Sequence, residues 1–218
     1  MKDKKTREMD PFNWDRISIS KYYDIKDILD EEGDDDITKS VRLIAVILDK
    51  DETEVWDMDL TEVGKYTNRL KFLEKFDLPR APKKVVLPGY TLVVMDDVTK
   101  LNVAQYVDYQ NFITLPFRDA IDKLLSVFLI PEGHKYNTDY DILDVQRDIR
   151  EHLSFRMAEA FLSFFLRRYG ESLIRSLDCY RRILKKEKDP MMKEKMMKKK
   201  EELTAAIRSL ILSSGSPS

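Results

Sequence analysis

Residues 85–168 decide the fold, through LNVAQYVDYQNFI at 101–113, LLSVFLIPEGHKYNTDYDI at 124–142 and RMAEAFLSFFLRR at 156–168. Apolar side chains recur in and between these phrases at the spacing of helices with one buried face. The last phrase is apolar around most of its circumference, which is typical of a central buried helix. Two expected core faces consist of Phe117, Ile121, Leu124, Leu125 and Phe128, and of Phe155, Ala158, Phe161, Leu162 and Phe165.

Just upstream, the phrase KVVLPGYTLVV at 84–94 predicts two short strands joined by a tight turn. Pro88 presets φ at one central position of the turn, and Gly89 tolerates a positive φ at the next. An isolated hairpin is only marginally stable, so we expect this one to pack on helices.

The N-terminal third predicts further helices. Residues 18–33 form a short one, with Ser18 or Ser20 as its N-cap and Leu29 on its apolar side. Residues 41–48 are apolar at almost every position, so their pattern is compatible with either a strand or a buried helix. Acidic capping residues at 34–36 favour the helix. Residues 58–76 predict one amphipathic helix, with Thr61 or Asp59 as its cap.

Together these patterns predict a mainly α fold, a helical bundle with one small β-hairpin. Pro79 and Pro82 mark the best internal boundary, because no apolar period crosses them. We expect an N-terminal helical region at 1–78, a hairpin plus helical core at 83–188, a basic, methionine-rich helix at 189–212 and a disordered tail at 213–218. Asp189 and Pro190 form a cap and first turn for that last helix.

Composition narrows the class of protein. The chain is 36% charged and 43% hydrophobic with a net charge of −2, which suits helices with solvated faces around a real core. A single cysteine, Cys179, excludes an internal disulfide and predicts a reducing compartment. The charged N-terminus lacks the apolar run of a secretory signal, and no apolar stretch is long enough to span a bilayer.

No pattern of catalytic or metal-binding residues emerges. The two histidines, His134 and His152, lack ligand spacing, and the six glycines are too scattered for a phosphate loop. We therefore expect no catalytic residues, metal or cofactor, and we do not expect an enzyme.

The C-terminal third offers two candidate binding features. Methionines interleave with lysines there, and methionine side chains repack around varied partners, so either a partner groove or core packing and self-association is expected. The candidate partner-binding residues are Phe164, Phe165, Met191, Met192, Met196 and Met197.

The second candidate feature is basic: residues 181–200 hold ten basic and three acidic side chains. This is either a solvated helical face or a surface for nucleic acid or an acidic partner. The basic patch comprises Arg181, Arg182, Lys185, Lys186, Lys198, Lys199 and Lys200.

Several of these phrases resemble small proteins of tailed bacteriophages. The resemblance covers residues 39–168 and rests on SVRLIAVILDKDETEVWDMDLTEVGKYTNRLKFLEKF, the hairpin KKVVLPGYTLVVMDDVTKL and the later phrases LLSVFLIPEGHKYNTDYDI and MAEAFLSFFLRR. Proteins with this pattern resemble tail-assembly chaperones, which hold the long helical tape-measure protein soluble, or minor virion components at the head–tail junction. Such motifs are structural rather than catalytic.

The resemblance implies a virion-assembly protein that acts in the host cytoplasm and binds a phage structural protein, such as the tape measure. A structural ring or adaptor subunit at the portal is the alternative, which would place the chain in the virion. A third hypothesis is a nucleic-acid binder that uses residues 181–200. Homo-oligomerisation is also expected to be compatible with these roles, whereas nucleic acid is disfavoured as a partner and a membrane is not expected.

Overall fold

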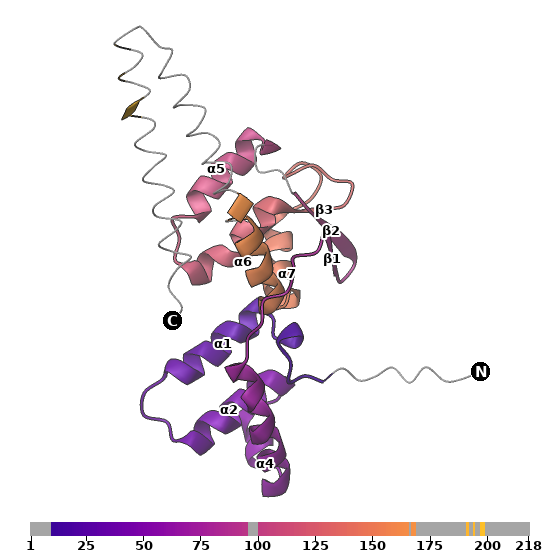
Figure 1. The fold of residues 1–218 in the computed structure, drawn as a ribbon. Coiled ribbons are helices and arrows are strands. Elements are labelled where there is room, and N and C mark those ends of the chain that lie inside the picture. The colour runs from indigo at the N-terminus through magenta and orange to yellow at the C-terminus, as the bar shows by residue number, and fades with distance from the viewer. Residues whose placement is uncertain are drawn as a thin grey trace, which may run out of the picture. The chain divides into compact units, whose positions relative to one another are not determined.

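The computed structural model describes residues 10–95, 100–165, 167–168, 191, 194, 197 and 198. The chain divides into two compact units, Met1–Val94 with Ala104–Phe161, and Met95–Val103 with Leu162–Ser218. Its described part is mainly helical with a small antiparallel sheet, which confirms the predicted fold class (Figure 1).

The first unit opens with a 3-10 turn, η1 (Trp14–Arg16), and two helices, α1 (Ile19–Asp30) and α2 (Asp36–Leu48), that pack against each other. The Ser18 hydroxyl accepts from the Lys21 amide and caps α1. The Asp35 carboxylate accepts from the Ile37 and Thr38 amides and caps α2. Residues 41–48 are therefore helical, as the acidic caps favoured. Leu29 was wrongly expected on the buried side of α1 and is exposed.

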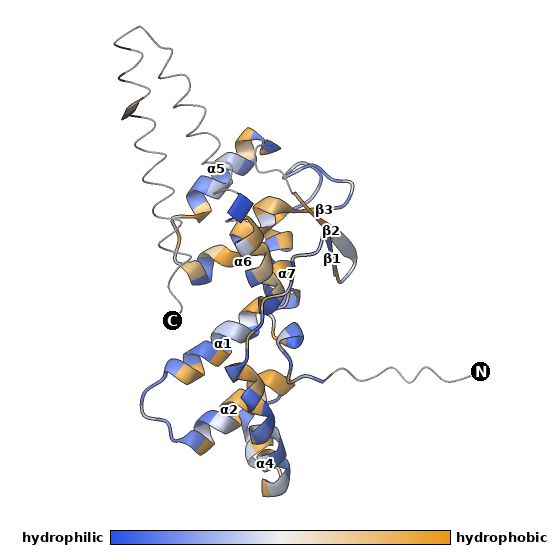
Figure 2. Cartoon of the chain, in the orientation of Figure 1, coloured by the Kyte–Doolittle hydropathy of each residue, from blue (hydrophilic) through white to orange (hydrophobic). Residues whose placement is uncertain are grey.

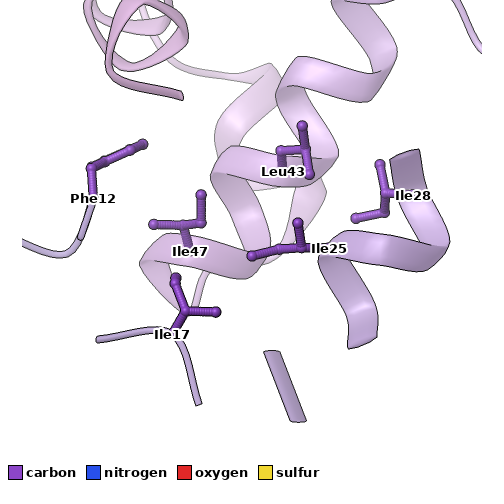
Figure 3. Close-up of a cluster of buried hydrophobic side chains, with 6 residues drawn as sticks. All are labelled: Phe12, Ile17, Ile25, Ile28, Leu43 and Ile47. Carbon is purple, nitrogen blue, oxygen red and sulfur yellow. The ribbon is translucent and has the colours of Figure 1, made fainter. Parts of the chain in front are cut away.

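Two shorter helices follow, α3 (Glu52–Trp56) and α4 (Leu60–Arg69), and then a 3-10 turn, η2 (Leu70–Glu74). The single helix predicted at 58–76 thus ends early, and Asp59 rather than Thr61 caps its start. In Figure 3, Ile17, Ile25 and Ile47 point toward one another, and Leu43 and Ile28 lie beside them. The rings of Tyr66 and Phe72 help to cover this cluster, so α4 and η2 close it.

The sheet has the strand order β1 (Lys84–Leu87), β2 (Tyr90–Val94), β3 (Leu129–Pro131), and both pairings are antiparallel. Gly89 has φ +89°, as the predicted turn requires. The sequence predicted only a hairpin, so β3 was missed. It follows α6 without a break and becomes a strand only because it pairs with residues 92–94.

Three further helices complete the labelled elements: α5 (Val103–Phe112), α6 (Phe117–Phe128) and α7 (Ile142–His152). Residues 155–165 are also helical, and the Ser154 hydroxyl accepts from the Met157 amide at their start. Apolar segments gather where α6 and α7 meet (Figure 2). The predicted core faces are buried at Ile121, Leu125, Phe128, Phe155, Ala158, Phe161, Leu162 and Phe165. Phe117, which is exposed, and Leu124, which is half-buried, are exceptions.

Within the first unit, the N-terminal helices are tied to the later ones. α1 packs on α7. The Phe155 amide donates to the Ile17 carbonyl at 2.7 Å, and the Ile19 amide donates to the Leu153 carbonyl at 3.2 Å. The ring of Tyr22 stacks on that of Phe155, with centroids 3.4 Å apart. The domain boundary predicted near residue 79 stays a prediction.

Candidate interaction surface

Helix α5 is fastened by polar contacts on its inner face. The Gln105 side-chain amide, which is buried, donates to the Val127 carbonyl at 2.9 Å. The Tyr136 hydroxyl donates to the Asp108 carboxylate at 2.7 Å, and burial together with this bond raises the pKa of Tyr136. Tyr109 packs edge-on against Phe128. The side chains of Gln105 and Asp108 thus attach α5 to the rest of the unit.

Apolar side chains of α5 and of Ile113, which directly follows it, are exposed beside the polar Gln110 and Asn111. Tyr106 is 53% exposed, Val107 48% and Ile113 43%. Phe117, at the start of α6, is 51% exposed. We name these four residues the α5 stripe. A helix with apolar side chains on its outer face and tightly fastened groups on its inner face is expected to meet a second surface.

The sequence around the stripe is nearly free of charge. Residues 101–117 contain one charged side chain, Asp108, in a chain that is 36% charged. That carboxylate lies on the inner face and accepts the bond from Tyr136. Depletion of charge together with exposed aromatic and aliphatic groups is the composition of the centre of a protein–protein interface. The stripe is therefore the candidate site.

One exposed apolar residue outside the stripe, Leu60, lies among charges. Leu60 begins α4, whose side chains line an open depression of about 570 Å³. Its lining consists of Asp59, Thr61, Glu62, Lys65, Tyr66 and Arg69. Both signs of charge are present and Glu62 accepts from the Tyr66 hydroxyl, as on an ordinary solvated helix face. This depression does not offer the neutral surface found at α5.

A buried polar cluster lies in the first unit. Asp122 of α6 is 6% exposed, and its carboxylate lies 3.5 Å from the Arg150 guanidinium of α7. Burial raises the pKa of Asp122, and Arg150 opposes that rise. Burial also raises the pKa of Tyr23 to about 12 and the pKa of Glu159 above its usual range. Among the described residues, no group of three or more histidine, cysteine, aspartate or glutamate side chains could hold a metal ion.

The residues predicted from sequence as partner-binding fall in different places. Phe165 is buried, and Phe164 is half-buried with the Arg168 guanidinium 5.5 Å from its ring centre. Met191 and Met197 are exposed. Met192 and Met196 lie outside the described residues, as does the basic patch except for Lys198, which is exposed. Partner binding by these side chains stays a prediction.

Sequence reasoning missed the α5 stripe. Periodicity alone could not find it, because apolar residues on α5 lie on two sides, and the buried side uses Gln105 and Asp108. The available signal was the scarcity of charge across residues 101–117.

No protein family model, curated protein or solved structure matches this chain. Within the part that the structure describes, no helix has the length and apolar content needed to cross a membrane.

Proposed function

We propose that this chain is an assembly protein that binds amphipathic helices of a partner protein through the α5 stripe. The observation that carries the proposal is an uncharged, exposed apolar face on a scaffold that is otherwise rich in charge. A protein that holds helices temporarily needs such a face, while charged surroundings oppose its own aggregation.

The specific form of the proposal is a tail-assembly chaperone of a tailed phage, whose partner is the tape-measure protein. Its support is the resemblance over residues 39–168. The tape measure is a long helical protein, and amphipathic helices dock on apolar helix surfaces through side chains at i, i+3, i+4 and i+7 spacing. A stripe on α5 matches that mode of recognition.

Co-expression with the tape-measure protein tests the proposal. The wild-type chain is expected to raise the soluble fraction of the partner several-fold. The variant Val107→Asp should abolish most of this effect, because it places an unpaired carboxylate in the contact. Val107 is half exposed, so the substitution should leave folding intact, which circular dichroism checks.

Leu143→Asp is the matched control, since Leu143 is an exposed apolar residue on α7, away from the stripe in sequence. It should behave as the wild type. A wild-type chain that leaves partner solubility unchanged would overturn the proposal, as would a Val107→Asp variant of full potency. A stable closed ring formed by the chain alone would support the portal-adaptor alternative instead.

A further inference from the structure

The absence of charge at the α5 stripe limits which helices it can bind, and this inference rests on the proposed function. Between Tyr106 and Phe117, a partner would meet only neutral side chains, with Gln110 exposed among the apolar ones. Asp108 is turned inward and bound by Tyr136. The stripe itself therefore contains no group that could pair with a charge on the partner.

The nearest charges on α6 do not fill this gap. The Arg118 guanidinium pairs with Asp27 at 2.7 Å and lies 5.1 Å from the centre of the Tyr23 ring, so it is already engaged by α1. Asp119 is two residues beyond Phe117, which places it about 200° around the helix from that ring. A charged side chain docked at the centre of the stripe would lose its water and gain no counter-charge from the stripe or from the start of α6.

We infer that the α5 stripe selects helices whose contact face carries no charged residue. The occupant is a partner helix of about three turns, because the ten residues of α5 span roughly 15 Å. Its contact face consists of apolar and small neutral polar side chains at i, i+3, i+4 and i+7, and its charges lie on the opposite face. A contact this small gives affinity on the order of micromolar or weaker, which suits temporary holding.

Selection by exclusion of charge follows from desolvation rather than from attraction. Lysine and glutamate at the centre of the contact should weaken binding alike, because each leaves water without a partner. An electrostatic site would instead favour one sign over the other. Equal penalties for both signs are therefore the signature of this stripe.

The test uses the full chain and three fluorescein-labelled synthetic helical peptides in an anisotropy titration. One peptide has an uncharged contact face, and the others carry a single lysine or a single glutamate at the centre of that face. The neutral peptide should bind, and each charged peptide should bind at least about tenfold more weakly. Equal or tighter binding of either charged peptide overturns the inference but leaves helix binding intact, whereas no binding of any peptide overturns the proposed function as well.

Placing a charge in the stripe tests whether the discrimination against charged peptides arises there. In Val107→Asp, the lysine peptide should bind more tightly than the neutral one, because the new carboxylate supplies the missing partner. The control Leu143→Asp should keep the wild-type order. The inference is overturned if Val107→Asp leaves the order unchanged. It is also overturned if sedimentation finds a dimer that Val107→Asp dissociates and the neutral peptide does not displace, since a second copy would then occupy the stripe.

Discussion

Arg156 holds three segments of the chain together with one side chain. Its guanidinium donates to the Asp15 carboxylate at 2.9 Å, to the Asp77 carbonyl at 2.9 Å and to the Asp77 carboxylate at 2.6 Å. The guanidinium side chain is only 19% exposed, although both carboxylates lie in solvent. The planar fork is what allows these bonds to form at once.

Arg156→Ala should therefore lower the free energy of unfolding by about 1–2 kcal/mol, a range that allows for screening of the exposed partners. Arg156→Lys should recover less than half of that loss, because an ammonium group cannot reproduce the fork. Urea denaturation measures both. A lysine variant as stable as the wild type would show that charge alone, rather than the geometry of the fork, accounts for the contact.

Glu159 makes the opposite contribution, since it forms no ion pair with any described residue and burial raises its pKa. The folded state then holds this proton more tightly than the unfolded state does. The contribution of Glu159 to the free energy of unfolding therefore falls as the pH rises from the ordinary glutamate pKa of 4.5 through the raised pKa of the folded state. Glu159→Gln keeps the shape and removes the charge. It should raise the unfolding midpoint at pH 7 and leave it unchanged at pH 4.

Thermal unfolding at the two pH values checks this expectation. Glu151→Gln, which changes an exposed glutamate of α7, is the control and should shift neither midpoint. If Glu159→Gln destabilised the protein at pH 7, the carboxylate would have to be stabilising the fold, and desolvation could not be its main effect.

Backbone conformation decides whether replacing a glycine by alanine stabilises or destabilises the chain at two positions, Gly89 and Gly64. Gly89 sits between β1 and β2 with φ +89°, a conformation that costs an L-residue energy whatever the surrounding space. Gly64 lies inside α4, and a Cβ there would meet nothing within 4 Å. Gly89→Ala should cost about 1–2 kcal/mol, whereas Gly64→Ala should stabilise the chain by about 0.5–1 kcal/mol. Chemical denaturation of the pair compares them, and a like sign for both changes would contradict this account.

Local signals predicted the elements that local chemistry specifies. Asp35 and Ser18 cap their helices, and Pro88 with Gly89 forms the hairpin turn, all within a few residues of the structure they determine. Strand β3 could not be predicted in this way, because its identity depends on pairing with residues 92–94, far away in sequence. The α5 stripe was missed for a related reason. Which side of α5 is buried depends on Val127 and Tyr136, which reach it from other elements.

The relation between the N-terminal helices and the later core is a property of the first unit as a whole. Pro79 and Pro82 predicted a boundary between them. Across that boundary, however, α1 packs on α7, and backbone hydrogen bonds run from Phe155 to Ile17 and from Ile19 to Leu153. Contacts of this kind are expected to make residues 10–94 and 104–161 unfold in one cooperative step.

Ile44→Val tests this expectation, because Ile44 is fully buried among the N-terminal helices. The lost methylene should cost about 1 kcal/mol. Hydrogen exchange under conditions of global unfolding should then show that loss both at 41–47, around the substitution, and at 121–128, in α6. The control Ile37→Val, at an exposed position, should change protection in neither segment.

If protection at 121–128 stayed at its wild-type value while protection at 41–47 fell, the two parts would unfold separately. The prolines would then mark a true domain boundary, and the hydrogen bond from Phe155 to Ile17 would be a contact between neighbouring domains rather than part of one core.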